Sequence, residues 1–281
     1  MTANNYVNLK DSKFISISGE DRNIFLQDLI TNDINKCNLN IPIYACLLTP
    51  QGKFIADFFI IDNKKNYLIE IHNKFVNEFL GKLKIYKLRS KIIISENNDF
   101  ASLVILENNN LLKLDNEIIN FTDPRSNKLG TKVFIKLDKI NNFTNKFNLH
   151  EVKFDLYREL LIKNLIPFSP NDLMVNKSLL LEYNFDKINA IDWDKGCYVG
   201  QEITARMKYR ALLKKSIRAV EIISGNVKLG NKIFNNQNAI GEIISCFNHL
   251  AIAMLKIDDA NDFFKNNKIL KTEFASLKII H

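Results

Sequence analysis

The cysteines of this chain lack the spacing of a metal site. The 281 residues include four cysteines, and no two of them form a Cys-x-x-Cys pair or a Cys/His spacing typical of zinc: Cys37, Cys46, Cys197 and Cys246. A metal centre built from this chain alone is therefore not expected. Free thiols are the expected state of all four side chains.

Targeting and membrane-spanning patterns are also missing. The first residues show neither a basic segment followed by an apolar one nor an arginine-rich amphipathic segment. No apolar run approaches the ~20 residues that cross a bilayer. These absences predict a cytoplasmic chain without a membrane partner.

Length and charge limit the architecture and the partners. A chain of 281 residues is long for one core, because single cores stop growing at about 250–300 residues, so two or three lobes are expected. The net charge of +8 permits attraction to anions, although lysine is spread through the whole chain. The densest basic run, 82–91, alternates with apolar residues and lacks arginine–aromatic clustering, so nucleic acid is not the favoured partner.

Hydrophobic periodicity predicts a mixture of helices and short strands. A helix is expected at 23–30, a β-hairpin at 44–49 and 54–61 around the turn 49–52, and a turn at 108–110. From Lys214 onward, short strands separated by Gly/Asn turns predict a small antiparallel barrel or sandwich. A helix at 154–165 is expected to place Leu156, Leu160 and Leu161 inward and Arg158, Glu159 and Lys163 outward.

Acidic residues within apolar strands are the anomalies of this pattern. Asp57 shares a strand face with Ile55 and Phe59, and burying an ionised, unpaired carboxylate costs several kcal/mol. Asp57 therefore lies either at a solvated strand edge or against a ligand cavity, and the residues alone leave both open. Glu182 follows an apolar run and reads by itself as the surface end of an element. Arg125 either reaches an anion or pairs with a local carboxylate.

The segment 194–210 concentrates glycines, charges and one cysteine. A nearby cation lowers the pKa of a thiol, and the candidate cations are Lys195, Arg206 and Arg210. Glycines let the backbone turn tightly and let a ligand or partner approach the sulfur of Cys197. Glu202 is spaced to pair with Arg206 if the segment is helical.

This segment resembles the signature of the YgfZ/GcvT family, folate-binding proteins related to the glycine-cleavage T-protein that assist iron–sulfur cluster maturation. The matching positions are Lys195, Gly196, Cys197, Tyr198, Gly200, Gln201, Glu202 and Arg206. Other segments resemble the family in the same order: 18–22, 25–27, 31–34, 48–53, 123–125, 204–206 and 209–210. The likeness extends to about Lys215.

The resemblance implies an α+β fold, a multi-lobed ring of antiparallel-sheet and helix lobes with a small C-terminal β-barrel. The expected domains are a folate-binding lobe at 1–140, a second lobe with the signature at 141–213, and the barrel at 214–281. It also implies that Asp57 matches the aspartate near the folate and Glu182 the glutamate that holds the pterin ring. Tetrahydrofolate or a one-carbon derivative is the implied cofactor.

The implied function is that of an accessory protein in iron–sulfur cluster assembly or repair, acting through Cys197 at the mouth of a folate cavity. Related aminomethyltransferases usually carry another residue in place of Cys197 and Arg in place of Gln201, which favours the iron–sulfur branch. Clusters generally need four protein ligands. A transient cluster would therefore be shared with an iron–sulfur carrier or scaffold protein.

Two alternatives stay open from the sequence. The first is a folate-dependent aminomethyltransferase in which Asp57 orients the folate and Cys197 is incidental. The second is a basic module that binds RNA or acidic polypeptides through 82–91. The sequence leaves undecided whether a reaction is catalysed, which folate form binds, which partner is met and whether the chain oligomerises.

Overall fold

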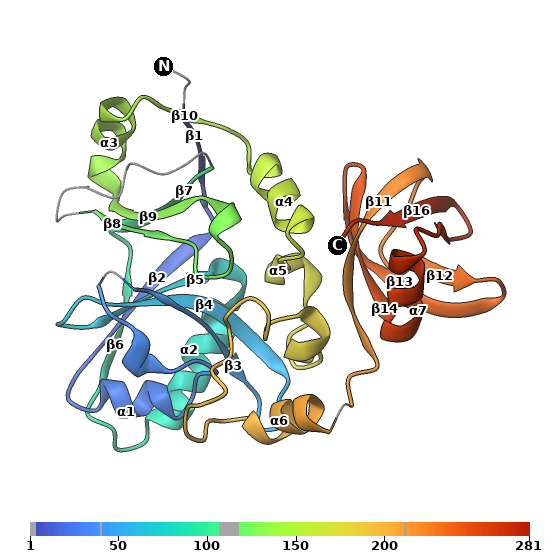
Figure 1. The fold of residues 1–281 in the computed structure, drawn as a ribbon. Coiled ribbons are helices and arrows are strands. Elements are labelled where there is room, and N and C mark those ends of the chain that lie inside the picture. The colour runs from blue at the N-terminus through green and yellow to red at the C-terminus, as the bar shows by residue number, and fades with distance from the viewer. Residues whose placement is uncertain (1–3, 40, 107–117, 211) are drawn as a thin grey trace.

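The computed structural model describes residues 4–39, 41–106, 118–210 and 212–281. The turn predicted at 108–110 lies outside these residues. The described strands form two five-stranded sheets and a closed barrel. Figure 1 shows the barrel to one side of the two sheets. No helix of the described part of the chain is long and apolar enough to cross a membrane.

The first sheet has its strands in the order β10-β1-β7-β9-β8. Their bounds are β10 (Leu149–Glu151), β1 (Asn4–Asn8), β7 (Phe100–Ile105), β9 (Thr131–Lys136) and β8 (Ile119–Thr122). The second sheet has the order β3-β4-β5-β2-β6. Its strands are β3 (Ile43–Leu48), β4 (Phe54–Asp62), β5 (Tyr67–His72), β2 (Ser12–Ser18) and β6 (Ile93–Asn97).

The predicted hairpin of the second sheet is confirmed. β3 pairs antiparallel with β4, so that Cys46 lies opposite Asp57. The N–H of Gly52 donates to the carbonyl of Thr49 at 2.8 Å and closes the turn. One core then joins the two sheets, because Phe14 of β2 packs edge-on against Phe134 of β9 with ring centroids 4.9 Å apart.

Helices cover the sheets and connect them. Their bounds are α1 (Arg22–Gln27), α2 (Asn73–Lys87), α3 (Ile140–Lys146), α4 (Phe154–Lys163), α5 (Ser169–Asp172), α6 (Gln201–Tyr209) and α7 (Ile257–Lys265). Short 3-10 helices are η1 (Ile34–Lys36), η2 (Asn127–Leu129), η3 (Leu137–Lys139) and η4 (Leu180–Tyr183). α1 ends at Gln27, earlier than the predicted 30, because Ile30 instead makes a β-bridge with Leu47.

The prediction for the faces of α4 is wrong at two positions. Leu156 is 49% exposed, whereas Arg158 is only 3% exposed. The Arg158 guanidinium donates to Asp172 of α5 at 2.7 and 3.1 Å and to Ser245 of the barrel at 3.0 Å. A buried arginine is tolerated here because these oxygens replace water around its charge.

The predicted C-terminal barrel is confirmed. Its closed strand order is β11-β14-β13-β12-β15-β16. The strands are β11 (Lys215–Gly225), β14 (Leu250–Lys256), β13 (Asn238–Phe247), β12 (Lys232–Asn235), β15 (Leu270–Lys271) and β16 (Ala275–Ile279). The barrel has its own apolar core, which includes Phe263 of α7. α4 and α5 lie between the sheets and the barrel in Figure 1.

Candidate functional site

A cavity of about 860 Å³ lies where the two sheets meet α4 and α5. Its floor comes from β3, β4, β5 and β9, and its outer wall from the chain between β10 and α5. Aromatic rings form much of the wall: Tyr44, Phe58, Phe59, Phe154, Tyr157 and Phe168. Charged groups enter it from several elements, so the cavity combines flat apolar surfaces with fixed polar positions.

Asp57 faces this cavity and does not lie at a solvated strand edge. The Tyr44 hydroxyl donates to its Oδ2 at 2.5 Å. Burial raises the pKa of Asp57, and the hydrogen bond from Tyr44 and the charge of Arg125 oppose that rise. The carboxylate therefore has one firm partner and keeps acceptor capacity for a ligand.

Ser169 lies in the same cavity and is 1% exposed. Its Oγ has no well-aligned hydrogen bond to a described residue. It is nevertheless close enough to Asp57 to lower the pKa of that carboxyl. Unsatisfied buried hydroxyls are uncommon in native proteins. A polar ligand group beside Asp57 would satisfy it.

A buried ion pair forms a second polar position. Lys132 of β9 pairs with Glu70 of β5, and both side chains are at most 3% exposed. The Ser12 hydroxyl donates to the other oxygen of Glu70 at 2.7 Å. Burial lowers the pKa of Lys132, while the charge of Glu70 raises it. The pair joins the two sheets at the cavity, because its members come from different sheets.

Arg125 pairs with a local carboxylate, which is one of the two possibilities that the sequence left open. It pairs with Asp123 at 2.7 Å and donates to the Tyr157 hydroxyl at 2.7 Å. Its guanidinium also lies 4.9 Å from the centre of the Phe59 ring. Arg125 therefore positions Tyr157 and the floor of the cavity.

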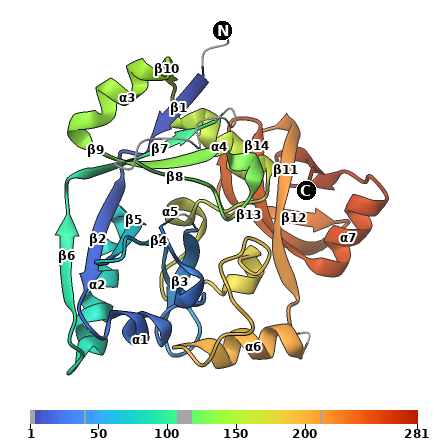
Figure 2. The ribbon, with the colours of Figure 1, turned by 60° about the vertical axis from the view of Figure 1, so that its left-hand side comes forward.

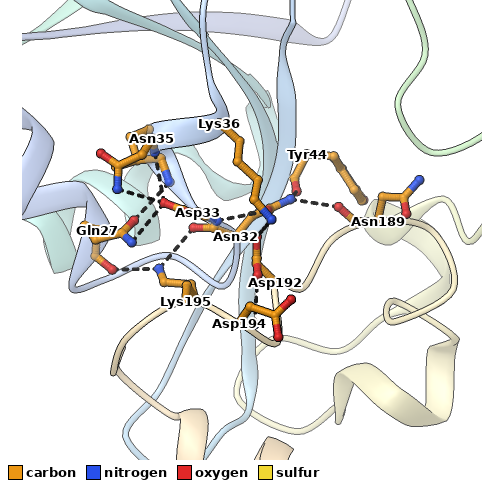
Figure 3. A network of polar contacts seen from close by, with 11 residues as sticks. Gln27, Asn32, Asp33, Asn35, Lys36, Tyr44, Asn189, Asp192, Asp194 and Lys195 are labelled. Atoms are coloured by element: carbon orange, nitrogen blue, oxygen red, sulfur yellow. Dashed lines mark hydrogen bonds and ion pairs between the residues drawn. The ribbon is translucent and has the colours of Figure 1, made fainter.

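Lys195 of the signature is a structural cation. Its Nζ donates to the carbonyls of Gln27 at 2.7 Å and Asn32 at 3.0 Å (Figure 3). It also donates to the carbonyl of Ile30 at 2.7 Å. Burial lowers its pKa to about 8. The ammonium thus binds three carbonyls at and just after the end of α1, which fixes the signature loop to that part of the chain.

The two glycines of the signature differ in their surroundings. Gly200 has φ +84°, and a Cβ there would lie 2.5 Å from the Thr49 carbonyl oxygen. A Cβ on Gly196 would meet nothing within 4 Å. Gly200 therefore permits tight packing of the loop on the β3–β4 turn, whereas Gly196 leaves open space beside Cys197.

The thiol of Cys197 is exposed, whereas Cys37 and Cys46 are buried. It precedes α6, in which Glu202 and Arg206 form the predicted ion pair. Tyr198 packs inward and is 7% exposed, and Gln201 opens the helix. Among the described residues, no three Cys, His, Asp or Glu side chains are grouped to hold a metal ion.

The structure separates the three predicted site residues. Asp57 lines the cavity, while neither Cys197 nor Glu182 is among the described residues that line it. Glu182 lies in η4 with its Oε1 3.6 Å from Nζ of Lys215, at the start of β11. The roles assigned to these residues stay predictions, as do the domain boundaries.

Sequence reasoning missed Tyr44, Glu70, Lys132 and Ser169. The signal that flagged Asp57 also applies to Glu70, because this carboxylate stands within the apolar strand β5. Lys132 likewise stands beside Val133 in a mostly buried strand. Ser169 carries no comparable signal, since a serine beside proline reads as an ordinary helix start.

Comparison with curated proteins gives relatives named for cluster assembly. An "Iron-sulfur cluster assembly factor IBA57 homolog, mitochondrial" of Coccidioides immitis (strain RS) is 29% identical over 240 residues, covering 77% of this chain and 56% of the relative. A protein of the same name from Neurospora crassa is 31% identical over 229 residues, covering 74% and 52%. The chain thus spans about half the length of these relatives. No model of a known protein family matches the chain.

A solved structure of glycine cleavage system aminomethyltransferase T from Bartonella henselae has the same fold. Its TM-score is 0.78, with 10% identity, over 99% of this chain and 85% of that chain. At this identity the likeness concerns the fold alone, and it confirms the predicted α+β, GcvT-like class. The comparison with curated proteins contradicts the predicted cytoplasmic location, because these relatives are named as mitochondrial.

Proposed function

We propose that the chain takes part in iron–sulfur cluster assembly, with tetrahydrofolate or a one-carbon derivative in the cavity and Cys197 as the thiol that meets a partner. The names of the curated relatives support the cluster role. The observation that carries the proposal is the exposed thiol of Cys197 on a fold that also holds a separate aromatic cavity of about 860 Å³.

The cluster is cargo in this proposal. One thiol supplies one ligand, whereas clusters generally need four. The described residues offer no group of three metal-ligating side chains. An iron–sulfur carrier or scaffold protein would therefore contribute the remaining ligands, and Cys197 would contact the cluster at the surface between the two proteins.

The cavity fits a folate in size and chemistry. Ligand pockets typically enclose about 300–1,000 Å³. The rings of Phe59, Phe154 and Phe168 offer flat surfaces to a bicyclic ring, and the Asp57 carboxylate accepts hydrogen bonds from ring N–H groups. Bound tetrahydrofolate would supply amines that carry one-carbon units.

The opening of the cavity suits the acidic end of a folate. Lys10 and Lys153 line the cavity and are exposed, so they can meet a carboxylate tail. Lys10 also lies 3.5 Å from Glu151. The described contact of Glu182 is with Lys215. Its part in the folate proposal therefore rests on the family resemblance.

Rescue of iron–sulfur enzymes tests the thiol. In a strain that lacks the protein, we expect Cys197→Ala to fail to restore iron–sulfur enzyme activity, because the cluster loses its contact with this chain. Cys246→Ala is the matched control, since Cys246 is the other exposed cysteine among the described residues, and it should restore activity. Equal rescue by both variants would make the role of Cys197 wrong.

Titration of purified variants of the cavity with tetrahydrofolate tests the folate proposal. Asp57→Asn should weaken binding by about tenfold or more, because the ligand loses a charged acceptor. Glu182→Gln tests the role that the family resemblance assigns to Glu182. It should weaken tetrahydrofolate binding only if this side chain reaches the ligand. Formation of methylenetetrahydrofolate from an aminomethylated carrier protein would instead indicate the aminomethyltransferase function.

A further inference from the structure

A basic and partly apolar surface lies at α6, close to the exposed thiol. We call it the α6 face, and its members are Lys208, Tyr209, Arg210, Leu212 and Lys214, all of which are exposed. Figures 1 and 2 both show α6 at the lower edge of the molecule. Tyr209 is 68% and Leu212 53% exposed, so two large apolar side chains stand among the cations.

No ion pair among the described residues neutralises the cations of this face. No Asp or Glu occurs between Ile203 and Val220. In the part of the chain that the structure describes, no acidic side chain lies within ion-pair distance of Lys208, Arg210 or Lys214. Glu202 of the same helix is paired with Arg206, so Lys208, Arg210 and Lys214 are left to attract acidic groups.

The α6 face and Cys197 are close enough to lie under one protein partner. Nζ of Lys208 is 3.7 Å from the centre of the Trp193 ring, and the Tyr209 ring is 6.0 Å from it. Cys197 follows Trp193 by four residues, which span at most about 14 Å. A standard interface covers roughly 800 Å² of each protein, or about 30 Å across.

Two members of the face belong to residue types that are enriched at protein interfaces. These are Tyr209 and Arg210. Open space beside Gly196 also leaves room for a partner at the sulfur. Lys195 adds nothing to this attraction, because its charge is directed into the chain.

We infer that the α6 face is the docking surface for an acidic face of a protein partner. Docking there places the partner's own metal-binding or thiol group at Cys197. The inference deepens the proposed function and rests on it for the nature of the partner. It rests on three cations without an ion-pair partner among the described residues, and on the exposed Tyr209 and Leu212 close to an exposed thiol.

Thiol–disulfide exchange tests this surface without iron, folate or a natural partner. The probes are two peptides of equal length, one rich in glutamate and one rich in lysine, each with one cysteine joined to 2-thiopyridine by a disulfide. The Cys197 thiolate attacks the peptide sulfur, the peptide–thiopyridine bond breaks, and one pyridine-2-thione is released. A Cys246→Ser background removes the second exposed thiol.

The readout is the exchange rate divided by the rate with neutral 2,2′-dithiodipyridine, so that changes in the thiol itself cancel. At low salt we expect the acidic peptide to react at least about tenfold faster than the basic one, and high salt to remove the difference. Lys208→Glu with Arg210→Glu should reverse the preference. Lys84→Glu with Arg89→Glu, an equal charge change at and beyond the end of α2, should leave it intact.

Equal rates for the two peptides, or equal losses in both double variants, would overturn the inference. Protection of Cys197 by a short single-stranded RNA at lower concentration than by an unactivated acidic peptide would assign the face to nucleic acid and also overturn it. The rescue of iron–sulfur enzymes is a separate measurement, so a failure of the proposed function would not be mistaken for a failure of this surface.

Discussion

At the scale of a single residue, His72 links the cavity to a helix start. Its Nδ1 accepts a hydrogen bond from the N–H of Lys74 at 3.1 Å and caps α2. Nε2 lies 3.9 Å from Asp11. Burial lowers the pKa of His72 below its usual value, opposed by the charge of Asp11 and reinforced by that of Lys74. The neutral ring is the form that the fold stabilises.

Stability should therefore fall as His72 takes up a proton. Its pKa is lower in the folded chain, so between that value and about 6.5 the unfolded chain binds more protons. The contribution is complete above pH about 6.5 and is lost as pH falls through the folded value. His72→Asn keeps a capping oxygen without this titration. Urea unfolding at several pH values should show a shallower acid loss for this variant.

The control for this titration is His249→Asn, which replaces an exposed histidine of the barrel. It should leave the pH dependence as in the unaltered chain. If the His72 variant lost as much unfolding free energy at acid pH as the unaltered chain, the burial of this ring would not explain the pH dependence of stability.

At the scale of elements, the signature loop is packed on the β3–β4 turn. Gly200 and Gly52 both have positive φ, at +84° and +69°, and they lie against each other. Val199 donates its N–H to the carbonyl of Asp28 at 3.0 Å. Three hydrogen bonds from Lys195 hold the same loop on the end of α1. The loop that presents Cys197 is thus fixed by backbone contacts on two sides.

Gly200→Ala should lower the free energy of unfolding by at least about 2 kcal/mol, because a left-handed alanine is strained and its Cβ meets the Thr49 carbonyl. Gly196→Ala provides the matched control, and its effect should stay within about 0.5 kcal/mol. Urea unfolding of both variants measures the difference. Similar losses at the two positions would contradict the packing role of Gly200.

At the scale of the molecule, Arg158 connects the cavity wall to the barrel. It binds Asp172 and the Ser245 hydroxyl of β13. The N–H of Phe168, which lines the cavity, donates to Asp172 at 2.7 Å. The barrel and the outer wall of the cavity therefore share one buried charge network.

Removing one charge of this network should be costly. Arg158→Met leaves the Asp172 carboxylate buried and unpaired, so we expect a loss of about 3–5 kcal/mol in the free energy of unfolding. Ser245→Ala should cost about 1.5 kcal/mol, and a double-mutant cycle between the two should show coupling. Lys163→Met, which breaks an exposed pair with Glu159, should cost less than about 1 kcal/mol. Additive effects of Arg158 and Ser245 would contradict the connection.

The sequence by itself determined the local structure. Periodicity and turn residues gave the β3–β4 hairpin, the start of α4 and most strands of the barrel, because these depend on neighbours in the chain. The apolar setting of Asp57 also identified a carboxylate with an unusual environment. The glycine, cysteine and charge pattern of 194–210 selected the segment that presents the exposed thiol.

Only the tertiary structure decided which distant groups meet. Glu70 and Lys132 are 62 residues apart in the chain, and Arg158 and Ser245 are 87 apart, so no local pattern shows that they are partners. The same holds for Lys195, whose charge reads locally as a neighbour of the thiol but binds carbonyls near α1. Burial of a charge depends on partners brought by other elements, and those partners are fixed when the sheets, α4 and the barrel pack together.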